Sequence, residues 1–229
     1  SFDPDAEPAE DAQTVVGKRA ADSGEFFGAE IFSRNLIFLI DVSGSMAMFD
    51  QGELRRKEAE KARIRLDRAR KQLLGAIESL PKTARFNIIA YSNKVTTWQK
   101  GLKPASKSAI KSAGRFVKEF LARGATYTDD ALKRAFEDAE ADTIVLLSDG
   151  APTKPDFPSD YLIGQILKDI ANRNAARKLR INTFGFEGTG LWPDKIPGPP
   201  SGPRPTPPRK DVETFTGFMN PLAEEDHGP

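Results

Sequence analysis

Two carboxylates in this sequence, Asp41 and Asp149, each follow a run of apolar residues, and hydroxyl side chains stand close by in the chain. Ser43 and Ser45 come two and four residues after Asp41, and Thr126 lies in a Gly-Ala-Thr segment. Two carboxylates and three hydroxyls form an all-oxygen ligand set, which hard divalent cations such as Mg²⁺ prefer. These five residues therefore predict a metal site, provided that the fold brings them together.

The apolar runs predict the strands that would position these residues. Residues 36–40 are continuously apolar, and residues 143–147 are apolar after Thr143, which is typical of strands buried on both faces of a parallel sheet. Residues 86–91 and 180–186 predict two more strands, and residues 95–99 a short antiparallel strand at an edge. Apolar residues at helical spacing predict four helices between the strands, over residues 53–80, 106–121, 126–139 and 161–176.

Strands that alternate with helices predict a doubly wound α/β fold, with three layers and a mostly parallel, Rossmann-like central sheet. In such sheets, ligands bind outside the carboxyl ends of the strands, at the point where the strand order reverses. If the strands before Asp41 and Asp149 are neighbours, the two carboxylates face each other across one crevice. Capping of the following helix by the serines is the simpler alternative for the first loop.

Composition limits the classes of function. The chain has no cysteine, which excludes disulfides and thiolate ligands, and its net charge of +1 gives no reason to expect nucleic acid as a partner. No apolar run approaches the length of about 20 residues that a transmembrane helix needs. The chain begins with Ser, so we expect it to be part of a longer protein. The basic segment 55–71 is best interpreted as a solvated helix face.

The domain boundaries follow from composition. Residues 1–24 are acidic and poor in large apolar groups, which predicts a tail or linker, and residues 25–229 form the domain. Residues 191–209 are so rich in proline that they predict a surface insertion without regular structure. Residues 212–225 predict a last helix, with Pro221 inside its pattern.

At the candidate metal ligands the sequence resembles the von Willebrand factor type A family. Residues 41–46, Asp-Val-Ser-Gly-Ser-Met, match the family's Asp-x-Ser-x-Ser loop, residues 124–126 match its threonine loop, and residues 146–153 match its aspartate loop. Residues 86–102 and 27–28 look most like the variant found in inter-alpha-trypsin inhibitor heavy chains and related bacterial proteins. The chain departs from the family in extra charged residues at 51–65, and it ends where a further strand is expected.

The resemblance implies a metal-ion-dependent adhesion site. Ser43, Ser45 and Thr126 would be hydroxyl ligands, and Asp41 and Asp149 the charged pair, around Mg²⁺ or, alternatively, Mn²⁺ or Ca²⁺. A Glu or Asp carboxylate from a partner protein would complete the coordination. This implies a non-enzymatic binding module, with a secreted or periplasmic location slightly favoured. Two alternatives stay open at this point: a metal-dependent hydrolase, and a structural interaction module with a vestigial metal site.

Overall fold

A computed structural model of the chain describes residues 23–26, 29–48 and 64–186 of the 229. Its main sheet has six strands. Five of them lie in the order β5 (Val95–Thr97), β4 (Arg85–Tyr91), β3 (Asn35–Asp41), β7 (Thr143–Ser148) and β8 (Arg180–Gly185), and the two-residue β6 (Lys103–Pro104) also pairs with β4. β3, β4, β7 and β8 are parallel, whereas β5 is antiparallel at the edge. The predicted fold class is therefore confirmed.

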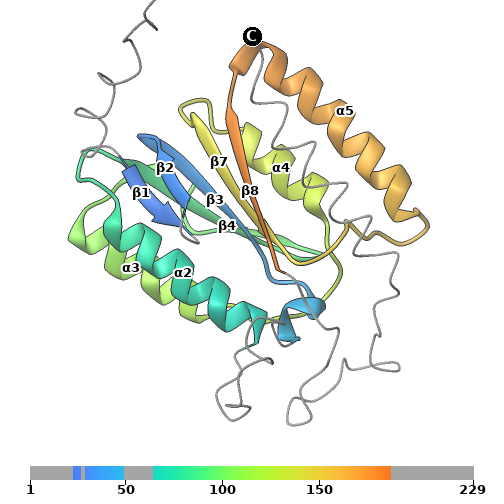
Figure 1. Cartoon of the computed structure of the whole chain (residues 1–229), viewed down its shortest axis with the longest axis horizontal. Coiled ribbons are helices and arrows are strands. Elements are labelled where there is room, and N and C mark those ends of the chain that lie inside the picture. Colours follow the sequence, from blue (N-terminus) through green and yellow to red (C-terminus); the bar gives the residue numbers. More distant parts are fainter. Residues whose placement is uncertain (1–22, 27–28, 49–63, 187–229) are drawn as a thin grey trace, which may run out of the picture.

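Helices cover both faces of this sheet (Figure 1). α2 (Arg65–Ser79) and α3 (Lys107–Lys118) lie on one face, and α4 (Thr128–Phe136) and α5 (Ser159–Arg177) on the other. Because successive strand residues point to opposite faces, Phe38 and Ile40 of β3 pack with α2 and α3 while Ile37 and Leu39 pack with α4 and α5. The continuous apolar run thus serves two cores at once.

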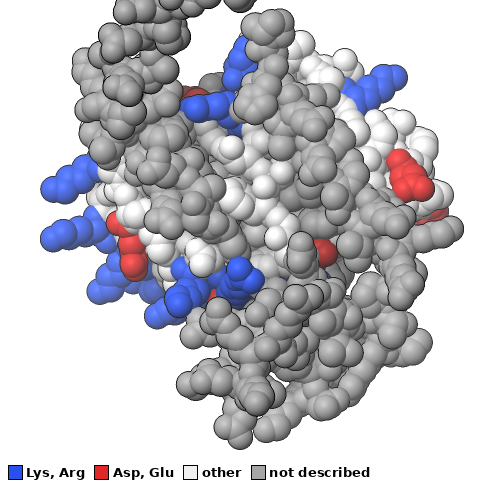
Figure 2. All heavy atoms as spheres, in the orientation of Figure 1, with Lys and Arg blue, Asp and Glu red and all other residues white. Residues whose placement is uncertain are grey.

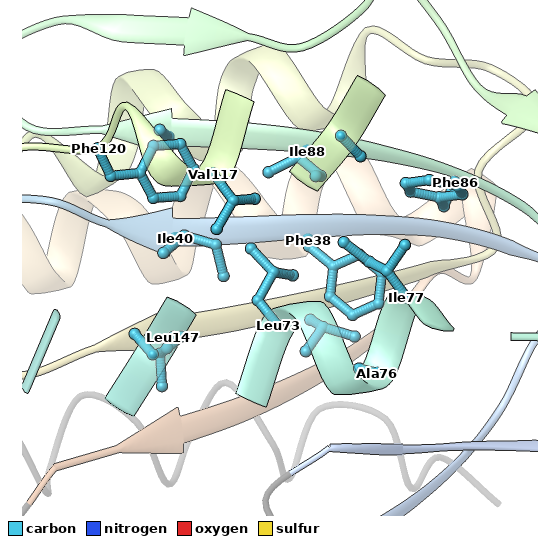
Figure 3. Packing of buried hydrophobic residues seen from close by; sticks show 14 of the residues in the cluster. Phe38, Ile40, Leu73, Ala76, Ile77, Phe86, Ile88, Val117, Phe120 and Leu147 are labelled. Atoms are coloured by element: carbon cyan, nitrogen blue, oxygen red, sulfur yellow. The ribbon is translucent and has the colours of Figure 1, made fainter. Parts of the chain in front are cut away.

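The first of these cores is the layer between the sheet and the helices α2 and α3 (Figure 3). Leu73 and Ile77 of α2 are fully buried against Phe38 and Ile40 of β3, and Val117 of α3 is equally buried. Burying each such side chain contributes on the order of 2 kcal/mol. This packing fixes the direction of β3, and with it the place where Asp41 leaves the sheet.

Several predicted boundaries differ from those of the structure. The helix predicted over residues 53–80 is α2, which begins at Arg65, and residues 53–63 lie outside the described part. Residues 106–121, 126–139 and 161–176 were assigned to helices correctly, although α3 and α4 are shorter than predicted. The strand β6 was not predicted. β1 (Ser23–Phe26), which pairs with β2 (Ala29–Phe32) in a separate hairpin, begins inside the predicted tail 1–24.

Other predictions concern residues that the structure does not describe. These are most of the tail 1–24, the proline-rich insertion 191–209 and the last helix 212–225. None of the helices in the described ranges combines the length and the apolar character that crossing a bilayer requires.

Candidate metal centre

Asp41 is the last residue of β3 and is completely buried. Its neighbour β7 is parallel to β3, with Ile40 opposite Leu147, so both strands end at the same edge of the sheet. The Asp41 carboxylate accepts two hydrogen bonds, from the backbone N–H of Ser43 at 2.7 Å and from the Ser148 hydroxyl at 2.6 Å. Asp41 therefore links the end of β3, its own loop and the end of β7.

The first loop turns through the short 3₁₀ helix η1 (Gly44–Ala47) and brings two serine hydroxyls together. The Oγ atoms of Ser43 and Ser45 lie 3.1 Å apart, and Ser45 Oγ donates to Asp149 Oδ1 at 2.7 Å. The other oxygen of Asp149 accepts a hydrogen bond from the guanidinium of Arg65. The Ser43 side chain makes no capping bond to η1, so helix capping does not explain this loop.

The threonine loop lies beside the serine loop because backbone hydrogen bonds join the two. The Gly44 N–H donates to the Gly124 carbonyl at 2.9 Å, and the Arg123 N–H donates to the Val42 carbonyl at 2.9 Å. Thr126 is 6% exposed, and its backbone N–H donates to Thr153 Oγ1 at 2.9 Å. All five predicted ligand positions are thus on three adjoining loops at the carboxyl edge of β3 and β7.

The electrostatics of this edge favour a bound cation. Burial, and next the negative charge of Asp149, raise the pKa of Asp41 to about 7, although the hydrogen bonds from Ser148 and Ser43 oppose the rise. Two carboxylates in one buried place destabilise each other's charged forms. A divalent cation would remove this penalty, so the charges of the site fit a metal.

The neighbouring polar groups also fit an enclosed ion site. The hydroxyl oxygens of Tyr91 and Thr128 are buried, and among the residues that the structure describes neither has a hydrogen-bond partner of normal geometry. Thr128 and Ser148 nevertheless lie close enough to Tyr91 to influence its pKa. Buried polar groups usually have a partner, which can be ordered water. No cluster of three or more His, Cys, Asp or Glu side chains occurs in the described ranges.

The interpretation of the basic segment is wrong in part. Arg65 belongs to the basic segment 55–71 that was interpreted as a solvated face, yet its side chain is 5% exposed and pairs with Asp149. Lys and Arg side chains do gather at the surface over α2 and α3 (Figure 2). The sequence offered no signal that would separate Arg65 from its neighbours, apart from its position at the start of the helix.

At the start of α4, Thr128, Asp129 and Asp130 carry polar side chains of the kind that can cap a helix. The N-cap is Tyr127, and the Thr128 hydroxyl makes no hydrogen bond. Asp129 and Asp130 instead pair with Lys154, at 2.7 and 3.0 Å. Burial of Asp129 would raise its pKa, but the hydrogen bond and the charge of Lys154 outweigh the effect of burial and lower that pKa. Lys154 thus ties the aspartate loop to α4.

Comparison with known families decides the classification. The sequence model of the von Willebrand factor type A domain matches residues 57–191, which is more than half of the chain. The chain belongs to the von Willebrand factor type A family. The matched region contains Thr126 and Asp149 but not the loop 41–45, so the placement of that loop in the site rests on its geometry in this structure.

Curated relatives are similar over most of the chain. Inter-alpha-trypsin inhibitor heavy chain H1 of Mesocricetus auratus is 28% identical over 167 residues, which are 67% of this chain and 16% of the relative. Heavy chain H4 of Homo sapiens is 28% identical over 181 residues, which are 74% of this chain and 18% of the relative. The chain therefore spans less than a fifth of the length of these relatives.

Solved structures support the fold. An aerotolerance-related membrane protein from Bacteroides fragilis superposes with a TM-score of 0.55 at 16% identity, covering 84% of this chain and 88% of that chain. A von Willebrand factor type A protein from Catenulispora acidiphila gives 0.51 at 18% identity, covering 86% and 44%. This von Willebrand factor type A domain is thus of the type found in heavy chains and bacterial proteins.

Proposed function

We propose that this domain binds a divalent metal through Asp41, Ser43, Ser45, Thr126 and Asp149, and that the metal recognises a Glu or Asp carboxylate of a partner protein. The observation that carries the proposal is the meeting of two buried carboxylates and two serine hydroxyls at one edge of the sheet, with the threonine loop joined to the serine loop by backbone hydrogen bonds. Neutral hydroxyl ligands leave a divalent ion short of negative charge, so an incoming carboxylate is favoured. Mg²⁺ suits such oxygen ligands, and Mn²⁺ and Ca²⁺ are the alternatives.

Exposed apolar side chains at the same edge support a protein partner. The large hydrophobic residues that the described ranges expose are Leu121, Phe157 and Tyr161, at 62%, 50% and 52%. Leu121 precedes the threonine loop, and Phe157 and Tyr161 follow the aspartate loop with their rings stacked at 5.6 Å. Aromatic residues are enriched in the cores of protein interfaces. A partner that reaches the metal would also contact these side chains.

Binding is better supported than hydrolysis. Ser45 donates a hydrogen bond to Asp149, but the other oxygen of this carboxylate is already paired with Arg65, so the arrangement is not that of a serine beside a free base. Ser43 Oγ contacts Ser45 Oγ, and the carboxylate nearest to it, Asp41, is buried and already accepts hydrogen bonds from the Ser43 N–H and the Ser148 hydroxyl. We keep a secreted or periplasmic location, within a longer chain, as part of this proposal.

Metal binding is tested by thermal melting in EDTA and in millimolar MgCl₂ or MnCl₂. A ligand that binds only the native state raises Tm. The wild type should gain Tm with metal, and Asp41→Ala should not. Asp169→Ala, which removes a partly exposed carboxylate that pairs with Arg173, should behave as the wild type does. Isothermal titration that finds no metal binding by the wild type would exclude the proposal.

Recognition of a carboxylate needs a second experiment. Peptides selected from a displayed library on the Mg²⁺-loaded domain should contain Asp or Glu, and should lose binding in EDTA or after Asp→Asn or Glu→Gln exchange. Phe157→Ser should weaken the same peptides without changing metal affinity. Selected peptides that bind equally well in EDTA would contradict the proposed mode of binding.

A further inference from the structure

The ion pair between Arg65 and Asp149 joins the start of α2 to the candidate metal ligands. Its side chains are 5% and 0% exposed, so both charges are removed from solvent. Asp149 uses one oxygen for Arg65 and the other for Ser45. The backbone N–H of Arg65 donates to the Met48 carbonyl at 2.9 Å, which ties α2 to the end of the serine loop. The guanidinium is therefore held at the ligand carboxylate by the fold itself.

A buried carboxylate is destabilising unless a positive charge accompanies it. Here the guanidinium supplies that positive charge to Asp149, and a bound divalent metal would supply positive charge in the same place. Arg65 itself is incompletely satisfied, because its Nε atom is buried without a hydrogen-bond partner in the described ranges. The guanidinium can consequently leave Asp149 without breaking a complete network of bonds.

We propose that Arg65 is an internal cation that competes with the metal for Asp149, and that it thereby sets the affinity of the site for divalent ions. This inference rests on the proposed function. Without metal, Arg65 neutralises Asp149 and keeps the three loops together. Metal binding displaces the guanidinium from the carboxylate, and the free energy needed to break the ion pair weakens the net affinity for the metal. Arg65 is a positioning residue in this scheme and never a ligand.

The test is isothermal titration with MgCl₂ and MnCl₂ of the wild type, Arg65→Gln, Arg65→Lys and Lys71→Gln. Removing one buried positive charge beside the ligands should tighten metal binding by about tenfold or more. Arg65→Lys keeps the charge and should stay close to the wild type. Lys71 is on the exposed side of the same helix, so Lys71→Gln should not change the affinity. Equal or weaker metal binding by Arg65→Gln overturns the inference.

Melting temperatures keep the inference testable if Arg65→Gln is unstable. In EDTA this variant should melt below the wild type because Asp149 is left buried and unpaired, and Mg²⁺ should raise its Tm by more than that of the wild type. A variant that folds only with Mg²⁺ supports the inference. A variant that stays unfolded at saturating Mg²⁺ contradicts it, since the metal then does not replace the guanidinium.

The two proposals fail in different ways. A wild type that binds metal, with an Arg65→Gln variant of the same affinity, leaves the proposed function intact and removes only the role of Arg65. If neither the wild type nor Arg65→Gln binds metal, the proposed function fails and this inference fails with it.

Discussion

Thr126 and Thr153 hold each other through two hydrogen bonds. The Thr126 N–H donates to Thr153 Oγ1 at 2.9 Å, and the Thr153 N–H donates to the Thr126 carbonyl at 2.9 Å. Thr126 precedes α4 and Thr153 follows β7, so this pair joins the threonine loop to the aspartate loop. A predicted metal ligand is thereby positioned by a residue that need not touch the metal.

Thr153→Val should weaken metal binding. The substitution keeps the shape of the side chain but removes the acceptor of the Thr126 N–H, a loss of about 1 kcal/mol that would reduce metal affinity by several-fold. Isothermal titration with MnCl₂ measures the change. Thr96→Val, on the exposed strand β5, is the matched control and should bind metal as the wild type does. Unchanged affinity in Thr153→Val would show that Thr126 is positioned by other contacts.

Stability without metal should fall as pH rises from about 4 to about 7. The folded-state pKa of Asp41 is about 7, whereas a solvent-exposed Asp has a pKa of 3.8, so the folded protein binds a proton that the unfolded chain has already released. An acid whose pKa is raised on folding stabilises the protein at low pH and loses this contribution as pH approaches the folded-state pKa. Urea unfolding in EDTA measures the effect.

Asp41→Asn is the control for this pH dependence, because it removes the titration and keeps an acceptor for Ser43. As pH rises across this range, the unfolding free energy of the wild type should fall relative to that of Asp41→Asn. Mg²⁺ should protect the wild type more at pH 8 than at pH 5, because the metal binds the ionised carboxylate. A difference that is independent of pH would contradict the raised pKa.

The predictions from sequence succeeded where one element decides the outcome. The apolar run before Asp41 needs burial on both faces, and β3 provides it. Asp41 and Asp149 lie at one edge because β3 and β7 are neighbouring parallel strands, whereas the loop of Thr126, between α3 and α4, is joined to that edge by backbone hydrogen bonds. The partners of charged side chains could not be predicted in this way. Whether Arg65 faces solvent or Asp149 depends on where α2 begins. The run of basic residues around Arg65 gives no sequence signal for that first residue.

Gly124 should not tolerate a side chain. Its φ of +81° disfavours any residue with a Cβ, and a Cβ there would lie 2.5 Å from Asn93 Oδ1. Gly124→Ala should therefore lower the unfolding free energy by about 1–3 kcal/mol and weaken metal binding, because the Gly124 carbonyl positions the serine loop. Adding Asn93→Ala should recover the steric part of the loss and leave the part due to φ.

Gly75 is the matched control for Gly124. A Cβ at Gly75 meets nothing within 4 Å, and the residue lies inside α2. Gly75→Ala should therefore stabilise the protein by about 0.5–1 kcal/mol. Urea unfolding of the three variants beside the wild type separates local strain from the general effect of alanine. Equal effects at Gly124 and Gly75 would show that the threonine loop adapts freely.

The substitution Tyr91→Phe tests whether the buried Tyr91 hydroxyl has a hydrogen-bond partner in the metal-free protein. This hydroxyl is buried without a hydrogen-bond partner of normal geometry in the described ranges, and burial, followed by the charge of Asp41, raises its pKa well above the usual value. Because an unpartnered buried hydroxyl is destabilising, Tyr91→Phe should leave metal-free stability unchanged or raise it by up to about 1 kcal/mol. Urea unfolding in EDTA tests this, and a clear loss would mean that the hydroxyl is hydrogen-bonded.

The same variant separates the metal-free state from the metal-bound one. If water bound with the metal occupies the polar space beside Asp41, the Tyr91 hydroxyl gains a partner only when metal is present. Tyr91→Phe should then lower Mg²⁺ affinity by about tenfold at most, the loss expected for one hydrogen bond. Phe136→Leu, in the core on the same face of the sheet, is the control: it should lower stability without changing Mg²⁺ affinity. Tighter Mg²⁺ binding by Tyr91→Phe would place this hydroxyl outside the network of the metal.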